Sequence, residues 1–222
     1  MQYPFSCVPN TFDCIEATLS PARLGRYLPA AKGDKHLALR LYVWNARLCE
    51  SMYFPLQTAE VAVRNAVQKP VGKRFKELWY QEPKFINILP VRMKNELAET
   101  VRKEVARRGA ALTGDHIIAG TSFGFWVHLM TRAYDKHLWA NGIKQYFPGA
   151  DATIDREAIF LMLNDMRSFR NDIMHHYAIF DRGPQAQFQN ILQITKLVCT
   201  EAHWFTSHLS RVSQVINTRP LV

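Results

Sequence analysis

Apolar residues recur at intervals of three and four along almost the whole chain, and strict alternation of apolar and polar residues is nowhere sustained. The first spacing places apolar side chains on one face of an α-helix, whereas alternation is typical of a half-buried strand. At 222 residues and 48% hydrophobic, the chain is long enough to bury a substantial core. We therefore expect a single all-α domain over residues 1–222, built as a helical bundle.

Caps, prolines and glycines divide this pattern into separate expected helices. Two short helices are expected first, over residues 12–19 and 20–28. Six longer ones are expected over residues 35–53, 55–75, 91–109, 121–142, 156–176 and 185–216. The residues placed to cap or end helices are Ser20, Asp34, Gly109 and Asp155. Pro70 is expected to interrupt its helix, because proline cannot donate a backbone hydrogen bond and crowds the preceding turn.

A surplus of basic residues points to an acidic partner. The chain has 28 Lys and Arg against 19 Asp and Glu, a formal net charge of +9, which favours RNA, DNA or an acidic protein over a membrane surface. No apolar run approaches the ~18 residues of a membrane span, and the first residues lack the pattern of a signal peptide. The cysteines have no metal or redox spacing and are expected to be buried free thiols; they are Cys7, Cys14, Cys49 and Cys199. We expect a cytoplasmic protein without a metal or other cofactor.

One stretch, RSFRNDIMHHYAIFDR at residues 167–182, concentrates titratable polar side chains. On a regular helix, at ~100° per residue, Arg170 and His175 would point ~140° apart. The helix is therefore expected to end or bend near His175, or the partner group must come from elsewhere. Arg167, Asn171 and His175 do share a stripe, because they follow one another at four-residue steps.

These residue types suit RNA cleavage. An RNA strand carries its own nucleophile, the 2′-hydroxyl, and needs a base, an acid for the 5′-oxygen leaving group, and positive charge around the phosphorane. Imidazole, with an unperturbed pKa near ~6.5, serves as base or acid near neutral pH, and a guanidinium binds phosphate oxygens through two donors. Asp172, four residues before His176, would accept that ring's proton and fix its tautomer. The alternative is a structural helix end, where a histidine caps the last carbonyls.

Two further polar groups have both a structural and a functional interpretation. The expected helix over residues 91–109 carries six basic residues, which are Arg92, Lys94, Arg102, Lys103, Arg107 and Arg108. They form either a solvated face or a track for RNA phosphates. Earlier in the chain, Glu60 and Arg64 are four residues apart and would form an intrahelical ion pair. In the functional interpretation, Arg64 and Asn65 line a cleft that binds RNA.

Three segments of the chain resemble the Abi-like (abortive-infection) proteins, which belong to the HEPN superfamily. The hallmark of that superfamily is an arginine, a polar residue and then a histidine; RNDIMH fits it with Arg170, Asn171 and His175. The match continues through RNDIMHHYAIFDR to Arg182. TAEVAVRNAV and TSFGFWVHLM also resemble the family and occur in its order, so the resemblance spans residues 35–185.

The resemblance implies a HEPN-like bundle that forms a homodimer, with two Arg–His motifs facing each other across one cleft. In many members this cleft is the active site of a metal-independent endoribonuclease, which leaves a 2′,3′-cyclic phosphate on its product. Carried over to this chain, His175 would be the catalytic base or acid and Arg170 would stabilise the phosphate. Asn171 would orient the substrate or the motif. His176 would assist, or would pack at the dimer seam.

The chain departs from the family after the histidine pair. Family members often have an aromatic residue next to asparagine before the final arginine, whereas this chain has Phe180, Asp181 and Arg182. An acidic side chain would repel a phosphate, which leaves open whether Arg182 binds RNA.

The function expected from the resemblance is a toxin-like effector in phage defence or in a toxin–antitoxin system. Such an enzyme needs a restraining antitoxin partner, either protein or RNA. The alternatives are a non-catalytic RNA-binding module and a dimeric scaffold that binds protein.

Overall fold

The computed structural model describes residues 10–221, and within them the chain forms helices and loops but no strand, which confirms the all-α expectation. The α-helices are α1 (Thr11–Leu19), α2 (Pro21–Leu24), α3 (Tyr27–Ala30), α4 (Lys35–Phe75), α5 (Pro83–Ile88), α6 (Val91–Arg108), α7 (Gly114–Gly120), α8 (Phe123–His128), α9 (Arg156–Met174), α10 (Pro184–Val198), α11 (Thr200–Leu209) and α12 (Val212–Ile216). Short 3-10 helices occur at Trp79–Gln81, Gly109–Ala111 and Arg132–Tyr134, and a π-helical turn at Asp135–Trp139. No helix among these residues is both long enough and apolar enough to cross a membrane.

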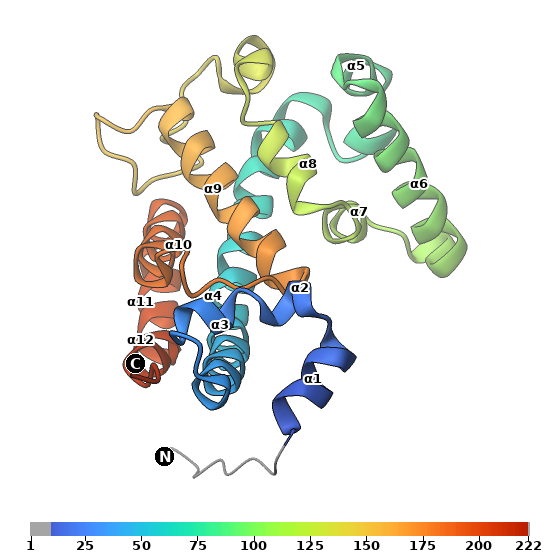
Figure 1. The fold of residues 1–222 in the computed structure, drawn as a ribbon. Helices are drawn as coiled ribbons and strands as arrows, with labels where there is room; N and C mark the ends of the chain where they lie inside the picture. The colour runs from blue at the N-terminus through green and yellow to red at the C-terminus, as the bar shows by residue number, and fades with distance from the viewer. Residues whose placement is uncertain (1–9, 222) are drawn as a thin grey trace.

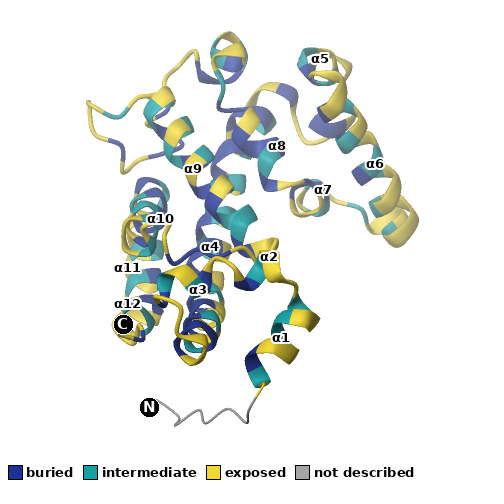
Figure 2. Ribbon diagram, viewed as in Figure 1, coloured by how far each residue is buried: buried dark blue, intermediate teal, exposed yellow. Residues whose placement is uncertain are grey.

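The long helix α4 is the axis of the fold (Figure 1). Its 41 residues give it a length of about 60 Å, and α3, α8, α10, α11 and α12 all pack against it. Along its length, residues such as Leu41, Leu48, Met52 and Val63 are fully buried, which Figure 2 shows as dark blue through the middle of the molecule. The core therefore forms around α4, while α5, α6 and α7 extend to one side.

The expected division of α4 into two helices is wrong. Residues 35–75 form one helix that contains both Pro55 and Pro70, so Pro70 does not interrupt it. An internal proline costs about 3 kcal/mol. Here both prolines are buried, and burying neighbours such as Leu56 and Val71 returns about 1.5–3 kcal/mol for each side chain. Packing on both sides of each proline outweighs the lost hydrogen bond.

Two other expected helices are broken instead. The helix expected over residues 121–142 ends at His128, and the chain turns back so that the Trp139 indole donates a hydrogen bond to the Leu129 carbonyl at 2.8 Å. The helix expected over residues 185–216 is three helices, α10, α11 and α12. Its first break is at Cys199, whose extended backbone (φ −160°, ψ 124°) redirects the chain so that α10 and α11 both pack on α4.

The expected caps are mostly confirmed. Asp34 accepts a hydrogen bond from the Leu37 amide at 3.0 Å, and Asp155 accepts one from Ala158 at 2.8 Å. Gly109 ends α6 with a φ of 53°. Ser20 is wrong as a side-chain cap: its φ is 83°, and its hydroxyl makes no capping bond.

The expectation that the cysteines are buried is wrong for the three that the structure describes. Cys14, Cys49 and Cys199 are free thiols, but Cys14 is exposed, because it lies on the outer side of α1, and the other two are only half-buried. Cys7 lies outside the described residues.

Candidate active site

Helix α9 carries the RNDIMHH segment, and its sequence pattern sets which way each polar side chain points. Five buried apolar residues face the core: Ile159, Leu163, Met166, Phe169 and Ile173. At 3.6 residues per turn, Arg167, Arg170 and Met174 fall on one flank of this stripe, and Asp165 and Asp172 on the other. The two flanks of α9 therefore carry opposite charge.

Contacts with neighbouring elements agree with this division. On the basic flank, the Arg170 Nε lies 3.4 Å from a carboxylate oxygen of Glu60 on α4. On the acidic flank, Asp165 accepts hydrogen bonds from α10, and Asp172 forms an ion pair with Arg182. The basic flank thus faces α4 and α8, and the acidic flank faces α10 and the loop before it.

The helix ends at Met174, as the sequence predicted, in a hydrogen-bonded helix stop. The His176 amide donates to the Ile173 carbonyl at 3.0 Å, and the Tyr177 amide donates to the Asp172 carbonyl at 2.8 Å. This is the Schellman pattern, in which the residue after the cap is left-handed and is usually glycine. Here that residue is His176, with a φ of 58°. A left-handed histidine costs about 1–2 kcal/mol, so the position is strained.

Both imidazoles stand in solvent. His175 and His176 are exposed, and among residues 10–221 no hydrogen bond from either ring is present; the His175 ring lies 6.0 Å from that of Tyr177. The expected bond between Asp172 and His176 is absent, since Asp172 is engaged by Arg182. The other loop acid, Asp181, is ion-paired with Arg26.

The expected RNA contact at Arg182 is weakened by the same contacts. Its guanidinium is already neutralised by Asp172, while the pairing of Asp181 with Arg26 removes much of the expected repulsion. The two effects leave this loop close to electrically neutral.

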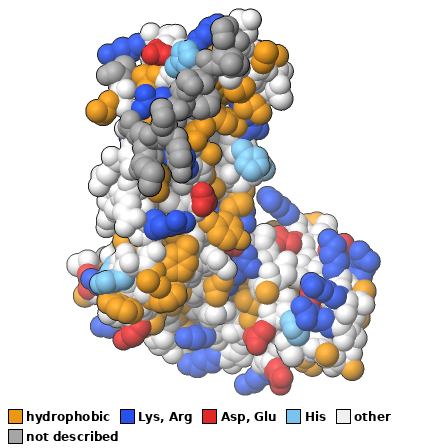
Figure 3. Space-filling model, turned by 90° about the horizontal axis from the view of Figure 1, so that it is seen from below, with side chains coloured by type: hydrophobic (Ala, Val, Ile, Leu, Met, Phe, Trp, Pro, Cys, Tyr) orange, Lys and Arg blue, Asp and Glu red, His pale blue; other side chains and the backbone are white. Residues whose placement is uncertain are grey.

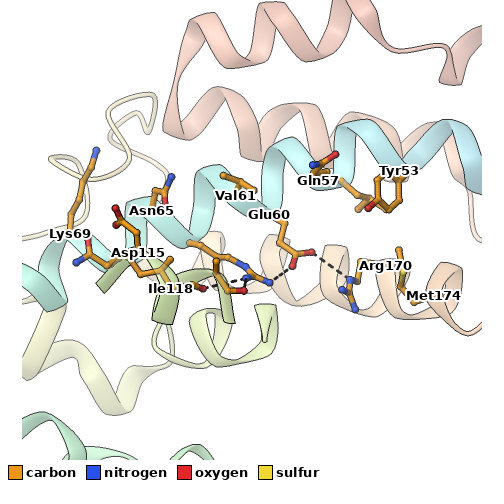
Figure 4. A pocket seen from close by; sticks show the side chains of 14 residues that line it. Tyr53, Gln57, Glu60, Val61, Asn65, Lys69, Asp115, Ile118, Arg170 and Met174 are labelled. Atoms are coloured by element: carbon orange, nitrogen blue, oxygen red, sulfur yellow. Dashed lines mark hydrogen bonds and ion pairs between the residues drawn. The ribbon is translucent and has the colours of Figure 1, made fainter. Parts of the chain in front are cut away.

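A groove lies directly beside Arg170 (Figure 4). It has a volume of about 860 Å³ and runs between α4, α7 and the end of α9. Its lining residues are Tyr53, Leu56, Gln57, Glu60, Val61, Arg64, Asn65, Gln68, Lys69, Asp115, Ile118, Ala119, Arg170 and Met174. Figure 4 shows Tyr53 and Met174 at one end of the groove and Lys69 and Asp115 at the other. Met174 directly precedes the histidine pair in sequence.

Glu60 connects the two arginines of this groove. Its carboxylate pairs with Arg64, one turn along α4, and also with Arg170 on α9. Arg64 donates in addition to the carbonyls of Ile118 at 3.3 Å and Ala119 at 3.0 Å, which joins α4 to α7. The side chains of Glu60 and Arg64 are only 13% and 14% exposed, whereas that of Arg170 is 34% exposed. Arg170 is thus held from the protein side and keeps donors facing the groove.

The intrahelical Glu60–Arg64 pair predicted from sequence is confirmed. Arg64 and Asn65 line the groove, and their contact with RNA stays a prediction. The bridge to Arg170 was missed. A signal for the groove did exist, because Tyr53, Gln57, Glu60 and Arg64 recur at three- and four-residue steps along α4. Asp115 had no such signal, since α7 was not among the expected helices.

The basic residues of α6 are placed differently. Arg102 and Lys103 both pair with Glu99, and Arg108 pairs with Glu104. Hydrogen bonds from Arg102 and Lys103 lower the pKa of Glu99 to about 2, and the bond from Arg108 lowers the pKa of Glu104. None of these residues, nor the exposed Arg107, lines the groove. For Arg102, Lys103 and Arg108, these contacts favour a solvated face over a phosphate track.

The end of α9 therefore offers two exposed imidazoles, neither of which lines the groove, and the partly exposed guanidinium of Arg170, which does. Among residues 10–221, no group of three or more His, Cys, Asp or Glu side chains is arranged to hold a metal ion. Compared with protein-family models, curated proteins and solved structures, the chain gave no match in any of the three searches, so its own residues carry the functional argument.

Proposed function

We propose that this protein is a metal-independent endoribonuclease whose site is formed by Arg170, Asn171, His175 and His176. The observation that carries the proposal is a held cation near a helix end that carries two exposed imidazoles. Glu60 pairs with Arg170, and neither the His175 nor the His176 ring makes a hydrogen bond or ion pair among residues 10–221. A structural histidine at a helix end would instead be expected to bond the last carbonyls.

In this proposal one imidazole removes the proton from the 2′-hydroxyl, and the oxygen attacks the adjacent phosphorus. A second imidazole gives its proton to the departing 5′-oxygen. The products are a 2′,3′-cyclic phosphate and a 5′-hydroxyl. The Arg170 guanidinium binds the non-bridging oxygens, whose negative charge grows in the phosphorane. Asn171, which accepts a weak bond of 3.4 Å from Arg170, steadies that guanidinium.

The backbone at His176 supports a functional role for its side chain. Strained residues of this kind cluster at active sites, although Asn10, Ser20, Lys32 and Lys76 also have a positive φ in this chain. Glycine would complete the same helix stop without strain. A histidine kept at a left-handed position is more easily explained by its imidazole than by packing, since the side chain is exposed.

The exposed apolar residues around the site support a homodimer. Tyr53, Met174 and Tyr177 are all large and exposed; the first two line the groove, and the last two flank the histidine pair in sequence. Apolar side chains gathered at a polar site are typical of an interaction surface. A second copy of the chain docked there would add a second Arg–His motif, so that base and acid come from different protomers, as in the Abi-like HEPN proteins that the sequence resembles.

The biological setting follows from the same resemblance. A cytoplasmic RNA-cleaving toxin in phage defence or a toxin–antitoxin system would need a protein or RNA antitoxin. The net charge of +9 suits an RNA partner as well as an RNA substrate. The second candidate is a non-catalytic RNA-binding protein with the same fold, which the neutralisation of Arg170 by Glu60 favours, because it leaves a net charge of only +1 among Glu60, Arg64 and Arg170.

The two candidates differ in what the substrate must contain. We would incubate the purified protein in excess EDTA with single-stranded RNA and with the same sequence bearing 2′-O-methyl groups. The endoribonuclease cuts the first and leaves the second intact, because only the first has the nucleophile. Cutting of both would contradict 2′-hydroxyl attack, and binding of both without any cutting would favour the non-catalytic candidate.

A further inference from the structure

A second group of basic side chains lies further along the basic flank of α9. It consists of Arg167 on α9, His128 at the end of α8 and Arg92 at the start of α6. Arg167 precedes Arg170 by three residues, so their Cβ atoms are about 5–6 Å apart on the helix surface. The group is therefore continuous with the site already described but does not belong to its groove, which it does not line.

Arg167 is half-buried without a carboxylate partner. Its Nη2 donates to the Asn164 amide oxygen at 2.8 Å, and its Nε is buried with no hydrogen-bond partner. An unsatisfied buried donor destabilises the fold, and more so when the group is charged. Arg170, by comparison, is ion-paired with Glu60. Among the described residues, Arg167 therefore has no carboxylate to neutralise its charge, whereas Arg170 has Glu60.

A glycine on α8, Gly124, leaves room for the Arg167 side chain to extend over that helix. A methyl group at Gly124 would lie 3.7 Å from the Arg167 Cδ and 3.8 Å from its Nη1, so the guanidinium passes over this glycine at van der Waals distance. This close approach carries the arginine from α9 towards His128, one turn further along α8.

His128 and Arg92 complete the group. The His128 ring lies 5.8 Å from that of Tyr134, whose hydroxyl donates to the Met93 sulfur at 4.0 Å, so His128 lies near the first turn of α6. In agreement, partial burial and then the guanidiniums of Arg167 and Arg92 lower the pKa of His128. Arg92 is exposed and makes no ion pair within residues 10–221. The nearest acid along α6, Glu96, is engaged elsewhere, since its carboxylate accepts a hydrogen bond from the Ser122 amide at 2.7 Å.

We propose that Arg92, His128 and Arg167 form a second phosphate-binding subsite, which holds a phosphodiester of the same RNA strand whose scissile phosphate lies at Arg170. The identity of the ligand as RNA rests on the proposed function, whereas the preference for a phosphate rests on the unpaired cations themselves. Guanidinium donors that lack a carboxylate are well suited to phosphate oxygens, which they bind through two parallel hydrogen bonds. The site then takes an extended strand rather than a mononucleotide.

The test is a binding measurement that needs no catalysis. A fluorescent single-stranded DNA oligonucleotide lacks the 2′-hydroxyl, so the proposed reaction cannot cut it, yet it presents the same phosphates. Its dissociation constant would be measured over a range of salt concentrations for wild type, Arg167→Gln and Arg92→Gln. Arg92 is exposed, so its variant is informative even if Arg167→Gln folds poorly. Arg47→Gln, at an exposed arginine of α4 with no ion pair, is the matched control.

Each lost phosphate contact makes the slope of log affinity against log salt shallower by about 0.7 for a single strand. We expect that change for Arg92→Gln and Arg167→Gln and no change for Arg47→Gln. Unchanged slopes in the first two, or an equal loss in the control, would overturn the subsite. The two proposals fail in different ways. Shallower slopes without any RNA cleavage would support the subsite and contradict the endoribonuclease. RNA cleavage with unchanged slopes would support the endoribonuclease and overturn the subsite.

Discussion

Helices α6 and α9 both carry several arginines, but they hold them in opposite ways. On α6, Arg102 and Arg108 pair with glutamates of their own helix. This helix lies in the lobe on the right of the molecule, where Figure 3 shows basic and acidic side chains intermingled. On α9, Arg167 and Arg170 point towards other elements, and one of them lines a groove.

The comparison shows that the number of basic residues in a segment is a poor guide to where an anion binds. The α6 segment is the more basic of the two in sequence, yet its charges are largely neutralised in the fold. The cations available to a ligand are those without a carboxylate partner, such as Arg167, or those that share one carboxylate with a second guanidinium, such as Arg170. Four experiments test this difference.

The largest difference is expected in catalysis. Arg170→Gln removes the guanidinium from the phosphate and should lower the rate of RNA cleavage by about 100- to 1,000-fold, the usual cost of losing a donor to a developing anion. Arg102→Gln removes the same charge from α6 and should leave the rate unchanged. Single-turnover cleavage assays of both variants would measure this. Equal losses in the two would show that α6 takes part in the reaction.

The next difference concerns stability. Glu60→Gln leaves two partly buried guanidiniums without their shared carboxylate, which should lower the free energy of unfolding by about 2 kcal/mol. Such a loss corresponds to a fall of about 4–8 °C in Tm for a chain of this size. Glu99→Gln on α6 breaks an exposed pair and should leave Tm almost unchanged. Calorimetry that found the two variants equally stable would contradict the structural role of Glu60.

The histidine pair gives a smaller effect with a distinctive sign. His176→Gly relieves a left-handed backbone and should raise the free energy of unfolding by about 1 kcal/mol while lowering the cleavage rate. His175→Gly is the matched control, because His175 has a φ of −89° and gains nothing from glycine. Its variant should be less stable than wild type, by about 0.5–1 kcal/mol. Denaturant unfolding would distinguish the two, and destabilisation by both would mean that the His176 backbone is not strained.

The smallest effect is the pH dependence of the α6 pairs. The folded-state pKa of Glu99 is lowered to about 2 from an ordinary value of 4.5, mainly by hydrogen bonds from Arg102 and Lys103. A carboxyl group with a depressed folded pKa adds stability above its unfolded pKa, and that stability is lost as pH falls from 4.5 towards 2. Glu99→Gln should flatten this part of the stability profile slightly, and 1 M salt should remove the difference. A pH dependence unaffected by salt would argue for a less exposed pair.

The sequence predicted which segments are helical better than it predicted where one helix ends and the next begins. The all-α class, the caps Asp34 and Asp155 and the end of α9 near His175 could all be predicted, because they depend on local spacing and local hydrogen bonds. The continuity of α4 through Pro70 could not, because it depends on burial by helices distant in the chain.

The candidate site divides in the same way. The Glu60–Arg64 pair is local and was predicted, whereas the contact between Glu60 and Arg170 joins residues far apart in sequence, for which no local pattern exists. The left-handed backbone at His176 was missed for another reason. Glycine usually signals that conformation, and a histidine in its place gives no such signal.

The central claim is that the end of α9 cuts RNA, and the most direct test is cleavage by wild type, His175→Ala and Arg102→Gln in excess EDTA, with end-group analysis of the products. We predict that wild type and Arg102→Gln cut RNA to leave 2′,3′-cyclic phosphate and 5′-hydroxyl ends, and that His175→Ala does not. Equal cleavage by all three proteins, or products with 3′-hydroxyl ends, would contradict the assignment of the reaction to this site.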